Sequence, residues 1–383
     1  MKKNVLLFLL FIFVCTTPVI AQIEDGKYVI GKQLTIHSEI LNQDRQLLVH
    51  LPIGYDVTST EYPVLYLLDG GYHFHHTTGI TQFLSGLGKM PQTIVVAIQN
   101  IDRNKDFLPT HIENPPTSGG GEAFLEFIQT ELLPYIDENY RTAPYRILVG
   151  HSFGGTFAMY AFLEKPALFN AYIAISPYLH WDNDFLLTKA ETALLKKYDN
   201  NTFFYMTLGD EPPYIPTIDK FVALIDSTSP ENLDFSFLHM IEENHGTAPH
   251  RSIYNGLETL FDGWGLTQET YVQGLAAIDQ HYQQLSETYG YVIMAPEATL
   301  NMLGYGYLAE NDFEKAIAVF QENVKRYPKS ANVYDSLGEA YEKNEQLEMA
   351  KANYAEACAL ASEDDPNYTI FQDNLERVKE LLK

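Results

Sequence analysis

A serine flanked by two glycines carries the strongest chemical signal in the chain. The motif GHSFG occupies residues 150–154, after a short apolar run and before a stretch rich in Ala, Phe, Leu and Met. A buried strand that enters a helix through G-x-S-x-G is typical of a nucleophile elbow, in which the serine projects from the top of a sheet. The alternative is a serine in an ordinary glycine-flanked turn, but the strand before the motif and the helix after it favour the elbow. We therefore interpret Ser152 as a nucleophile.

Two partners for this serine follow it in the chain. Asp210 and Glu211 come directly after the apolar run at 203–208, and His245 comes after the run at 233–241. The order serine, acid, histidine is that of α/β-hydrolases. In such a triad the histidine accepts the serine proton, and the carboxylate fixes the tautomer of the imidazole and stabilises the imidazolium.

Two of these assignments leave a choice. His250 is an alternative base, but it lies where the next helix begins, so we rank it behind His245. Either Asp210 or Glu211 could instead cap the turn that follows. We favour Glu211 because one more loop residue gives it reach away from the end of the strand.

An oxyanion would need two backbone N–H donors. One is predicted to come from Phe153, directly after the nucleophile. The other is predicted to come from Gly71 or Tyr72, because the glycine-rich segment at 69–72 brings flexible backbone to the end of the apolar run at 64–68.

Three histidines stand next to this segment, in what reads as a loop: His73, His75 and His76. Such histidines are usually solvated or line the rim of a site. A serine–histidine–acid mechanism also requires no metal. We therefore predict neither a metal nor any other cofactor.

The first 21 residues have the pattern of an export signal. Two lysines precede an apolar run at 5–14, and small residues lead up to a cleavage site predicted after Ala21. The run is too short to span a membrane. Cys15 suggests a lipoprotein as an alternative, but Val14 before it is not the small residue that lipoprotein processing prefers. We expect a secreted or periplasmic protein.

Composition narrows the classes of partner. The formal net charge is −25, and it becomes −27 once the two lysines of the signal are removed. Such acidity argues against binding to nucleic acid or to anionic membrane surfaces. Cys358 is then the single remaining cysteine, so no disulfide can form within the chain, although the compartment would permit one.

The elements that must position these residues alternate between strand and helix up to residue 264. Apolar runs predict strands at 47–51, 64–68, 93–98, 147–149, 171–176, 203–208 and 233–241, with helices near 80–87, 124–136, 153–164, 185–197, 218–226 and 250–261. Strands separated by helices predict a mostly parallel sheet that is covered on both faces. We therefore predict a domain of the α/β class over residues 22–264.

The chain between residues 45 and 261 resembles the putative esterase family of α/β-hydrolases, which includes siderophore esterases, feruloyl esterases, esterase D and S-formylglutathione hydrolases. The matching segments are YLLDG at 66–70, NIDRNKD at 100–106 with PT at 109–110, GHSFG at 150–154 and NHG at 244–246. The resemblance implies the α/β-hydrolase fold and ester hydrolysis, and it implies that Arg103 pairs with Asp106 beside the active site. The chain departs from the family at 210–212, where the sequence DEP leaves the acid ambiguous.

Substrate contacts are predicted from two segments. Residues 107–121, beginning with Phe107, end in a run rich in Pro and Gly that reads as a mobile rim. Tyr178 and Trp181 form a second wall after the next strand. These aromatic residues suit an apolar or aromatic acyl group, although they equally suit ordinary packing. Only 93 positions separate Ser152 from His245, which leaves no room for a large lid and favours small, soluble esters.

The last part of the chain repeats itself. Leu303, Gly304, Tyr307, Ala316 and Phe320 are each followed 34 residues later by an identical or similar residue. This period and pattern resemble tetratricopeptide repeats, with two helices per repeat. We predict a helical connector at 265–296, and two repeats with a closing helix at 297–383. The repeats predict a protein partner or self-association; the alternative is an appendage that only stabilises the chain.

Three functions agree with these patterns. The first is a secreted serine carboxylesterase. The second is a binding module in which the hydrolase is only a scaffold, and the third is an acyltransferase. The presence of the elbow, an acid and a histidine in the expected order favours the esterase.

Overall fold

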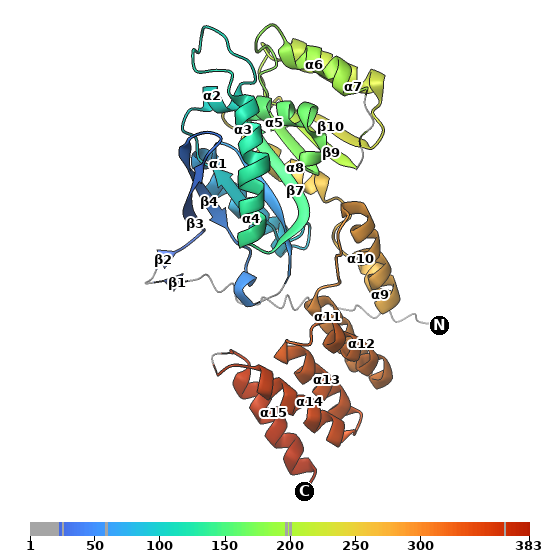
Figure 1. Ribbon diagram of the computed structural model, residues 1–383. Helices are drawn as coiled ribbons and strands as arrows, with labels where there is room; N and C mark the ends of the chain where they lie inside the picture. The colour runs from blue at the N-terminus through green and yellow to red at the C-terminus, as the bar shows by residue number, and fades with distance from the viewer. Residues whose placement is uncertain (1–22, 25–26, 58–59, 196–197, 199–200, 364) are drawn as a thin grey trace, which may run out of the picture. The chain divides into compact units, whose positions relative to one another are not determined.

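The computed structural model describes residues 23–24, 27–57, 60–195, 198, 201–363 and 365–383 (Figure 1). The predicted export signal, with the alternative at Cys15, lies outside these residues. Backbone contacts divide the chain into two compact units, the first ending at Asp262 and the second beginning at Gly263. Each unit has its own hydrophobic core. Within the described residues, no helix is both long enough and apolar enough to cross a membrane.

A mostly parallel sheet forms the centre of the first unit. In the described residues its strand order is β10-β9-β8-β7-β5-β6-β4-β3; neighbours from β10 to β6 are parallel, whereas β4 is antiparallel to both β6 and β3. The strands are β3 (Lys32–Ser38), β4 (Gln43–His50), β5 (Tyr62–Leu67), β6 (Ile94–Ile98), β7 (Thr142–His151), β8 (Ala171–Ile175), β9 (Thr202–Leu208) and β10 (Leu233–His239). A separate pair, β1 (Ile23–Glu24) and β2 (Lys27–Tyr28), precedes them. The predicted α/β-hydrolase fold is confirmed.

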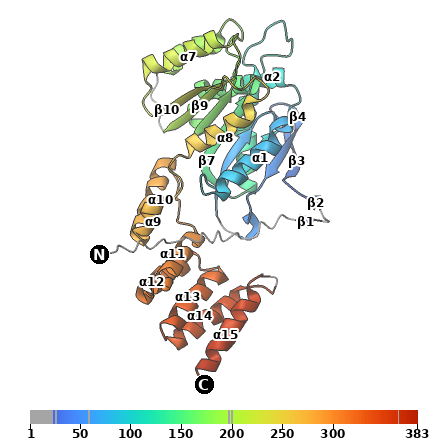
Figure 2. The same cartoon turned by 180° about the vertical axis from the view of Figure 1, so that it is seen from behind.

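Helices cover both faces of this sheet, which explains why β5, β6 and β8 are apolar and buried along their whole length. α1 and α8 lie together over one face (Figure 2), and α3, α4 and α5 cover the other. The helices of this unit are α1 (Gly70–Gly86), α2 (Arg103–Phe107), α3 (Gly121–Phe127), α4 (Leu133–Asn139), α5 (Phe153–Glu164), α6 (Phe185–Ala193), α7 (Ile215–Thr228) and α8 (Ala248–Leu260). A π-helical turn at Ile128–Leu132 joins α3 to α4.

Helix α1 begins ten residues earlier than the sequence predicts. Gly70 and Gly71 are its first two residues, and Asp69 precedes them in the left-handed conformation, with φ 54°. As a result His73, His75 and His76 lie on a helix and not in a loop. Gly70, Phe74, Thr77 and Thr78 in its first turns are buried, and this packing compensates for the poor helix propensity of glycine.

The second unit consists of helices alone among its described residues. These are α9 (Gln268–Val272), α10 (Leu275–Tyr289), α11 (Glu297–Ala309), α12 (Phe313–Arg326), α13 (Ala331–Lys343), α14 (Leu347–Leu360) and α15 (Tyr368–Leu381). α11 packs against α12, and α13 packs against α14. The repeated glycines permit this close packing, because a Cβ at Gly304 would lie 2.5 Å from the Phe320 ring and one at Gly338 would lie 2.7 Å from the Tyr354 ring. The unit therefore fits a tetratricopeptide-like extension.

Candidate active site

Ser152 lies at a sharp turn between the central strand β7 and helix α5. Its backbone has φ 59° and ψ −123°, a conformation that is strained for a residue with a side chain. Its N–H group donates to the carbonyl of Ile175 on the neighbouring strand, at 2.9 Å. A Cβ at Gly150 would lie 2.1 Å from the Gly154 carbonyl oxygen, so no side chain larger than glycine fits there. These are the features of a nucleophile elbow.

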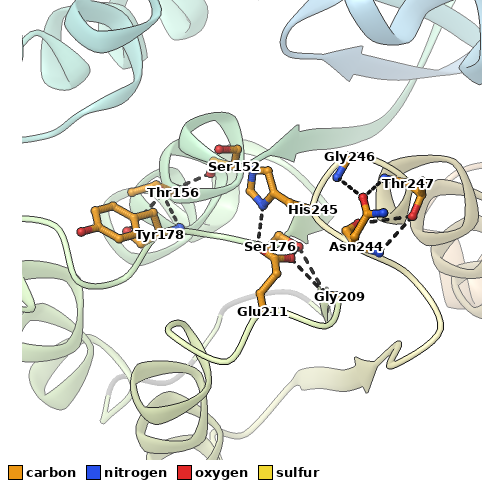
Figure 3. Close-up of polar contacts among 10 residues, drawn as sticks. All are labelled: Ser152, Thr156, Ser176, Tyr178, Gly209, Glu211, Asn244, His245, Gly246 and Thr247. Atoms are coloured by element: carbon orange, nitrogen blue, oxygen red, sulfur yellow. Dashed lines mark hydrogen bonds and ion pairs between the residues drawn. The ribbon is translucent and has the colours of Figure 1, made fainter.

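His245 lies beside this serine, with Glu211 on its other side (Figure 3). The Nδ1 atom of His245 is 2.5 Å from Oε2 of Glu211. The other carboxylate oxygen of Glu211 accepts hydrogen bonds from the Ser176 hydroxyl at 2.5 Å and from the Gly209 N–H at 3.2 Å. With Nδ1 engaged in this way, Nε2 is the atom of His245 that remains for the serine.

The neighbouring acid does not take part in this arrangement. Asp210 is exposed, and its backbone N–H donates to the Glu243 carbonyl at 2.6 Å. Glu211, by contrast, is 8% exposed. The structure thus brings Glu211, and not Asp210, to His245.

Two opposing effects act on the ionisation of Glu211. Burial acts to raise the pKa of its carboxyl, but the hydrogen bonds from His245, Ser176 and Gly209 outweigh burial and leave the pKa below its ordinary value. Glu211 is therefore a carboxylate at neutral pH, which favours the Nδ1–H tautomer of His245.

The alternative base lies elsewhere. His250 is exposed near the start of α8, and its ring packs against His76 of α1, with ring centroids 5.4 Å apart. Glu211 is bonded to His245 and not to His250. The geometry agrees with ranking His250 second.

Two helices begin close to the serine. The first N–H groups of a helix have no partner within it, and this set includes Phe153, the first residue of α5, and Gly71, the second residue of α1. The two helix starts are close, because a Cβ at Gly154 would lie 3.0 Å from the Asp69 carboxylate. Tyr72 is a poorer donor than expected, since its N–H already donates to the Asp69 carbonyl at 2.9 Å.

The implied pairing of Arg103 with Asp106 is wrong. Arg103 instead donates to both carboxylate oxygens of Asp69, at 3.1 Å each, and Asn100 also donates to Asp69. Asp106 forms a buried two-point pair with Arg45, at 2.7 and 2.8 Å. Arg45 comes from β4, so its pair with Asp106 fixes α2 to the sheet. The pair of Arg103 with Asp69 holds the residue that precedes α1.

The predicted substrate residues differ in their accessibility. Phe107 is 1% exposed and packs against core phenylalanines, so its side chain is not available to a substrate. Trp181 is also buried; it donates to the Thr110 hydroxyl at 2.9 Å and contacts the Phe153 ring. Tyr178 is half-buried and also contacts Phe153, so it alone of the three predicted residues has substantial exposure beside the serine.

One aromatic residue beside His245 was not predicted. The Tyr214 ring packs edge-on against His245, with centroids 5.9 Å apart, and it also contacts Tyr178 at 5.4 Å. The signal that could have found it is its position in the turn that follows Glu211, where its N–H donates to the Glu211 carbonyl.

Known proteins are similar to the first unit of the chain in sequence and in fold. Residues 38–203 match the family described as Putative esterase. Ferri-bacillibactin esterase BesA of Bacillus subtilis is 33% identical over 172 residues, which are 39% of this chain and 60% of BesA. The siderophore enterobactin esterase of Emericella nidulans is 37% identical over 89 residues, 21% of this chain and 28% of that protein. The chain thus spans less than two thirds of either relative.

A solved structure extends the similarity further. The IroE-like serine hydrolase from Shewanella oneidensis has a TM-score of 0.69 and 27% identity, covering 78% of this chain and 99% of that one. The parallel sheet, the elbow at Ser152 and the family match over residues 38–203 lead to one conclusion. Residues 38–203 of this chain are similar to the putative esterase family, and the first unit has the fold of an α/β-hydrolase.

Proposed function

We propose that the chain is a serine hydrolase of carboxylic esters, with Ser152 as nucleophile, His245 as base and Glu211 as the acid. The observation that carries the proposal is the position of the His245 ring. Glu211 holds one ring nitrogen at 2.5 Å, while the ring lies beside the serine of the elbow. A nucleophile next to a base that is oriented by a third group is the signature of covalent acyl transfer.

The reaction would run in two halves. The Ser152 hydroxyl oxygen attacks the ester carbonyl carbon while its proton passes to Nε2 of His245, and the N–H groups of Phe153 and Gly71 donate to the new oxyanion. The carbonyl re-forms, the bond to the alcohol breaks, and His245 returns its proton to the departing alcohol. Water then attacks the acyl-enzyme by the same proton route and releases the acid.

Two observations bear on the choice of substrate. Tyr178 and Tyr214 place aromatic rings around the serine and the base, which suits esters with flat or apolar groups. BesA is named for its action on ferri-bacillibactin, and the Emericella relative is named for enterobactin. We propose small, soluble esters, with siderophore esters among them, as the substrate class.

The decisive test is hydrolysis of acetyl, butyryl, octanoyl and feruloyl esters, and of iron-loaded and iron-free siderophore esters, by wild-type protein and Ser152→Ala. Because the triad acts as a unit, the variant should lose turnover on every substrate and keep its melting temperature. Equal turnover by both proteins would refute the proposal. A folded wild type that turns over nothing would favour the binding module, and preferential acyl transfer to an added alcohol would favour the acyltransferase.

Two further parts of the proposal concern location and assembly. The pattern at residues 1–21 supports export, and the N-terminus of the protein recovered from cells should then be residue 22. The helix pairs of the second unit support a role in binding a protein partner or a second copy. Sedimentation velocity over a range of concentrations tests self-association directly.

A further inference from the structure

A row of histidine rings runs along the sheet edge that carries the serine. Adjacent ring centroids are 4.6 Å apart for His245 and His151, 5.4 Å for His151 and His73, 5.2 Å for His73 and His76, and 5.4 Å for His76 and His250. The rings come from the end of β7, from α1, from the loop after β10 and from α8. Only His245, at one end of the row, has a role in the mechanism given above.

The inner rings of the row are uncharged at neutral pH. Burial, followed by repulsion from the other histidines, lowers the pKa of His76 to about 4. Burial and repulsion from His245, His73 and Arg103 lower the pKa of His151 to about 3, against a hydrogen bond with the His245 backbone that acts to raise it. Burial also lowers the pKa of His73, even though Asp69 lies nearby.

Packing alone does not explain imidazoles at these positions. Nε2 of His151 and Nδ1 of His76 are buried without a hydrogen-bond partner in the described residues, and an apolar ring would avoid that cost. Metal binding does not explain them either, because no three His, Cys, Asp or Glu side chains in the described part of the chain are placed to hold an ion. What His151 does contact is the ring of His245, with centroids 4.6 Å apart.

We propose that His151 is a positioning residue for His245: it provides a flat, neutral wall that holds the base ring in place between Glu211 and Ser152. This inference rests on the proposed function. The ring planes are tilted by 44° and their centroids are 4.6 Å apart, so the two rings are in close contact. An imidazolium that forms on His245 during the reaction then lies against a neutral ring, a favourable contact.

Charged groups around the pair agree with this role. His245 is bonded to Glu211, and Tyr214 packs edge-on against its ring. His151 is faced by His73 and by Arg103, and the positive charge of Arg103 is paired with Asp69. Glu211 therefore supplies the negative charge that acts directly on the base, while its neighbour His151 stays uncharged.

The first test compares His151→Ala, which removes the wall, with His151→Phe, which restores a flat neutral ring. His151→Ala should lower kcat between about threefold and thirtyfold with little change in KM, which is the range of a cation held against a ring face. His151→Phe should recover most of this loss. A wild-type kcat in His151→Ala, or a His151→Phe variant as slow as His151→Ala, would overturn the proposal.

A matched control is available at the opposite edge of the sheet. His50 is also partly buried with a lowered pKa, and its ring bonds to the Ile30 carbonyl at 2.6 Å. His50→Phe should change the melting temperature but leave kcat unchanged. An equal loss of kcat in His50→Phe and His151→Ala would show a general effect on stability and overturn the positioning role.

A second measurement needs no turnover. ¹H–¹³C NMR spectra of the histidine rings report the protonation of each ring, and the His151 signal is identified by its loss in His151→Phe. This signal should not titrate between about pH 5 and 9, because the pKa of His151 is lowered to about 3. A midpoint within that range would overturn the neutral wall even if the enzyme is active. A wild type without esterase activity would instead refute the proposed function, and with it the role of its base.

Discussion

Replacing Glu211 by Gln should distinguish the proposed triad acid from its neighbour Asp210 most sharply. Gln keeps the size of the side chain but removes its charge, and it replaces one acceptor oxygen by an NH₂ group. The carboxylate of Glu211 accepts hydrogen bonds from three donors, on His245, Ser176 and Gly209. In the Gln variant the NH₂ group would face at least one of these donors, and that hydrogen bond would be lost. Asp210→Asn is the matched control, because it removes a charge from the adjacent, exposed side chain.

The magnitude follows from what the carboxylate does. A hydrogen bond to a charged group contributes about 1.5–3 kcal/mol, which corresponds to about tenfold to 150-fold in rate if it is made only in the transition state. A Gln amide that donates to Nδ1 would also favour the tautomer in which Nε2 carries the proton and cannot accept one. Together these effects should lower kcat by roughly 10³–10⁴ in Glu211→Gln.

Steady-state kinetics on the best ester of the panel would measure this loss, with circular dichroism to show that each variant is folded. Asp210→Asn should keep kcat close to the wild-type value. If Asp210→Asn were the slow variant, or if Glu211→Gln lost less than about tenfold, then the contact between Glu211 and His245 would not orient the base during the reaction.

Three other outcomes are expected. His245→Ala should lower kcat by at least about 10⁴ while His250→Ala stays near wild type, and the reverse order in a kcat assay would make His250 the base. A chain ending at Asp262 contains the whole candidate site, so it should keep its turnover per folded molecule even if sedimentation shows a changed oligomeric state. A truncated chain that is folded but inactive would show that the second unit is needed for the site. Because the pKa of His151 is lower in the folded protein, its contribution to the free energy of unfolding is present above about pH 6.5 and is lost as the pH falls. Denaturant titrations should show a loss on the order of 2 kcal/mol from this group between about pH 7.5 and 5, which should be absent in His151→Phe.

Sequence patterns predicted the central strands well because those strands are buried on both faces. The apolar runs that became β5, β6, β8 and β9 need no knowledge of their neighbours to be read as strands. Strand β3 was not predicted, since it lies at the edge of the sheet and its exposed and buried residues alternate over a mostly polar segment. The start of α1 was missed for a related reason: Gly70 and Gly71 have poor helix propensity, and the burial of Gly70 and Phe74, which stabilises this helix start, depends on the rest of the fold.

The residues of the candidate site also differ in how well the sequence predicted them. Some occupy a fixed place in a local sequence pattern and could be predicted: Ser152 in the elbow, Phe153 after it, and His245 after the last strand. The partners of Arg103 and Asp106 could not be found in this way, because the contacts join residues that are 34 and 61 positions apart. Both side chains lie in one short segment, and neighbouring opposite charges suggest a local pair that the structure does not form.

The charges around the serine show why these distant pairs matter. The chain carries a formal net charge of −25, so its general field opposes the negative charge that develops on an oxyanion. Close to the serine, however, the buried carboxylates are already paired: Asp69 with Arg103 and Asn100, Asp106 with Arg45, and Glu211 with His245. The nearest unbalanced partial charges are then the positive starts of α5 and α1. An acidic protein can therefore favour an oxyanion locally, because pairing removes the carboxylates that would otherwise oppose it.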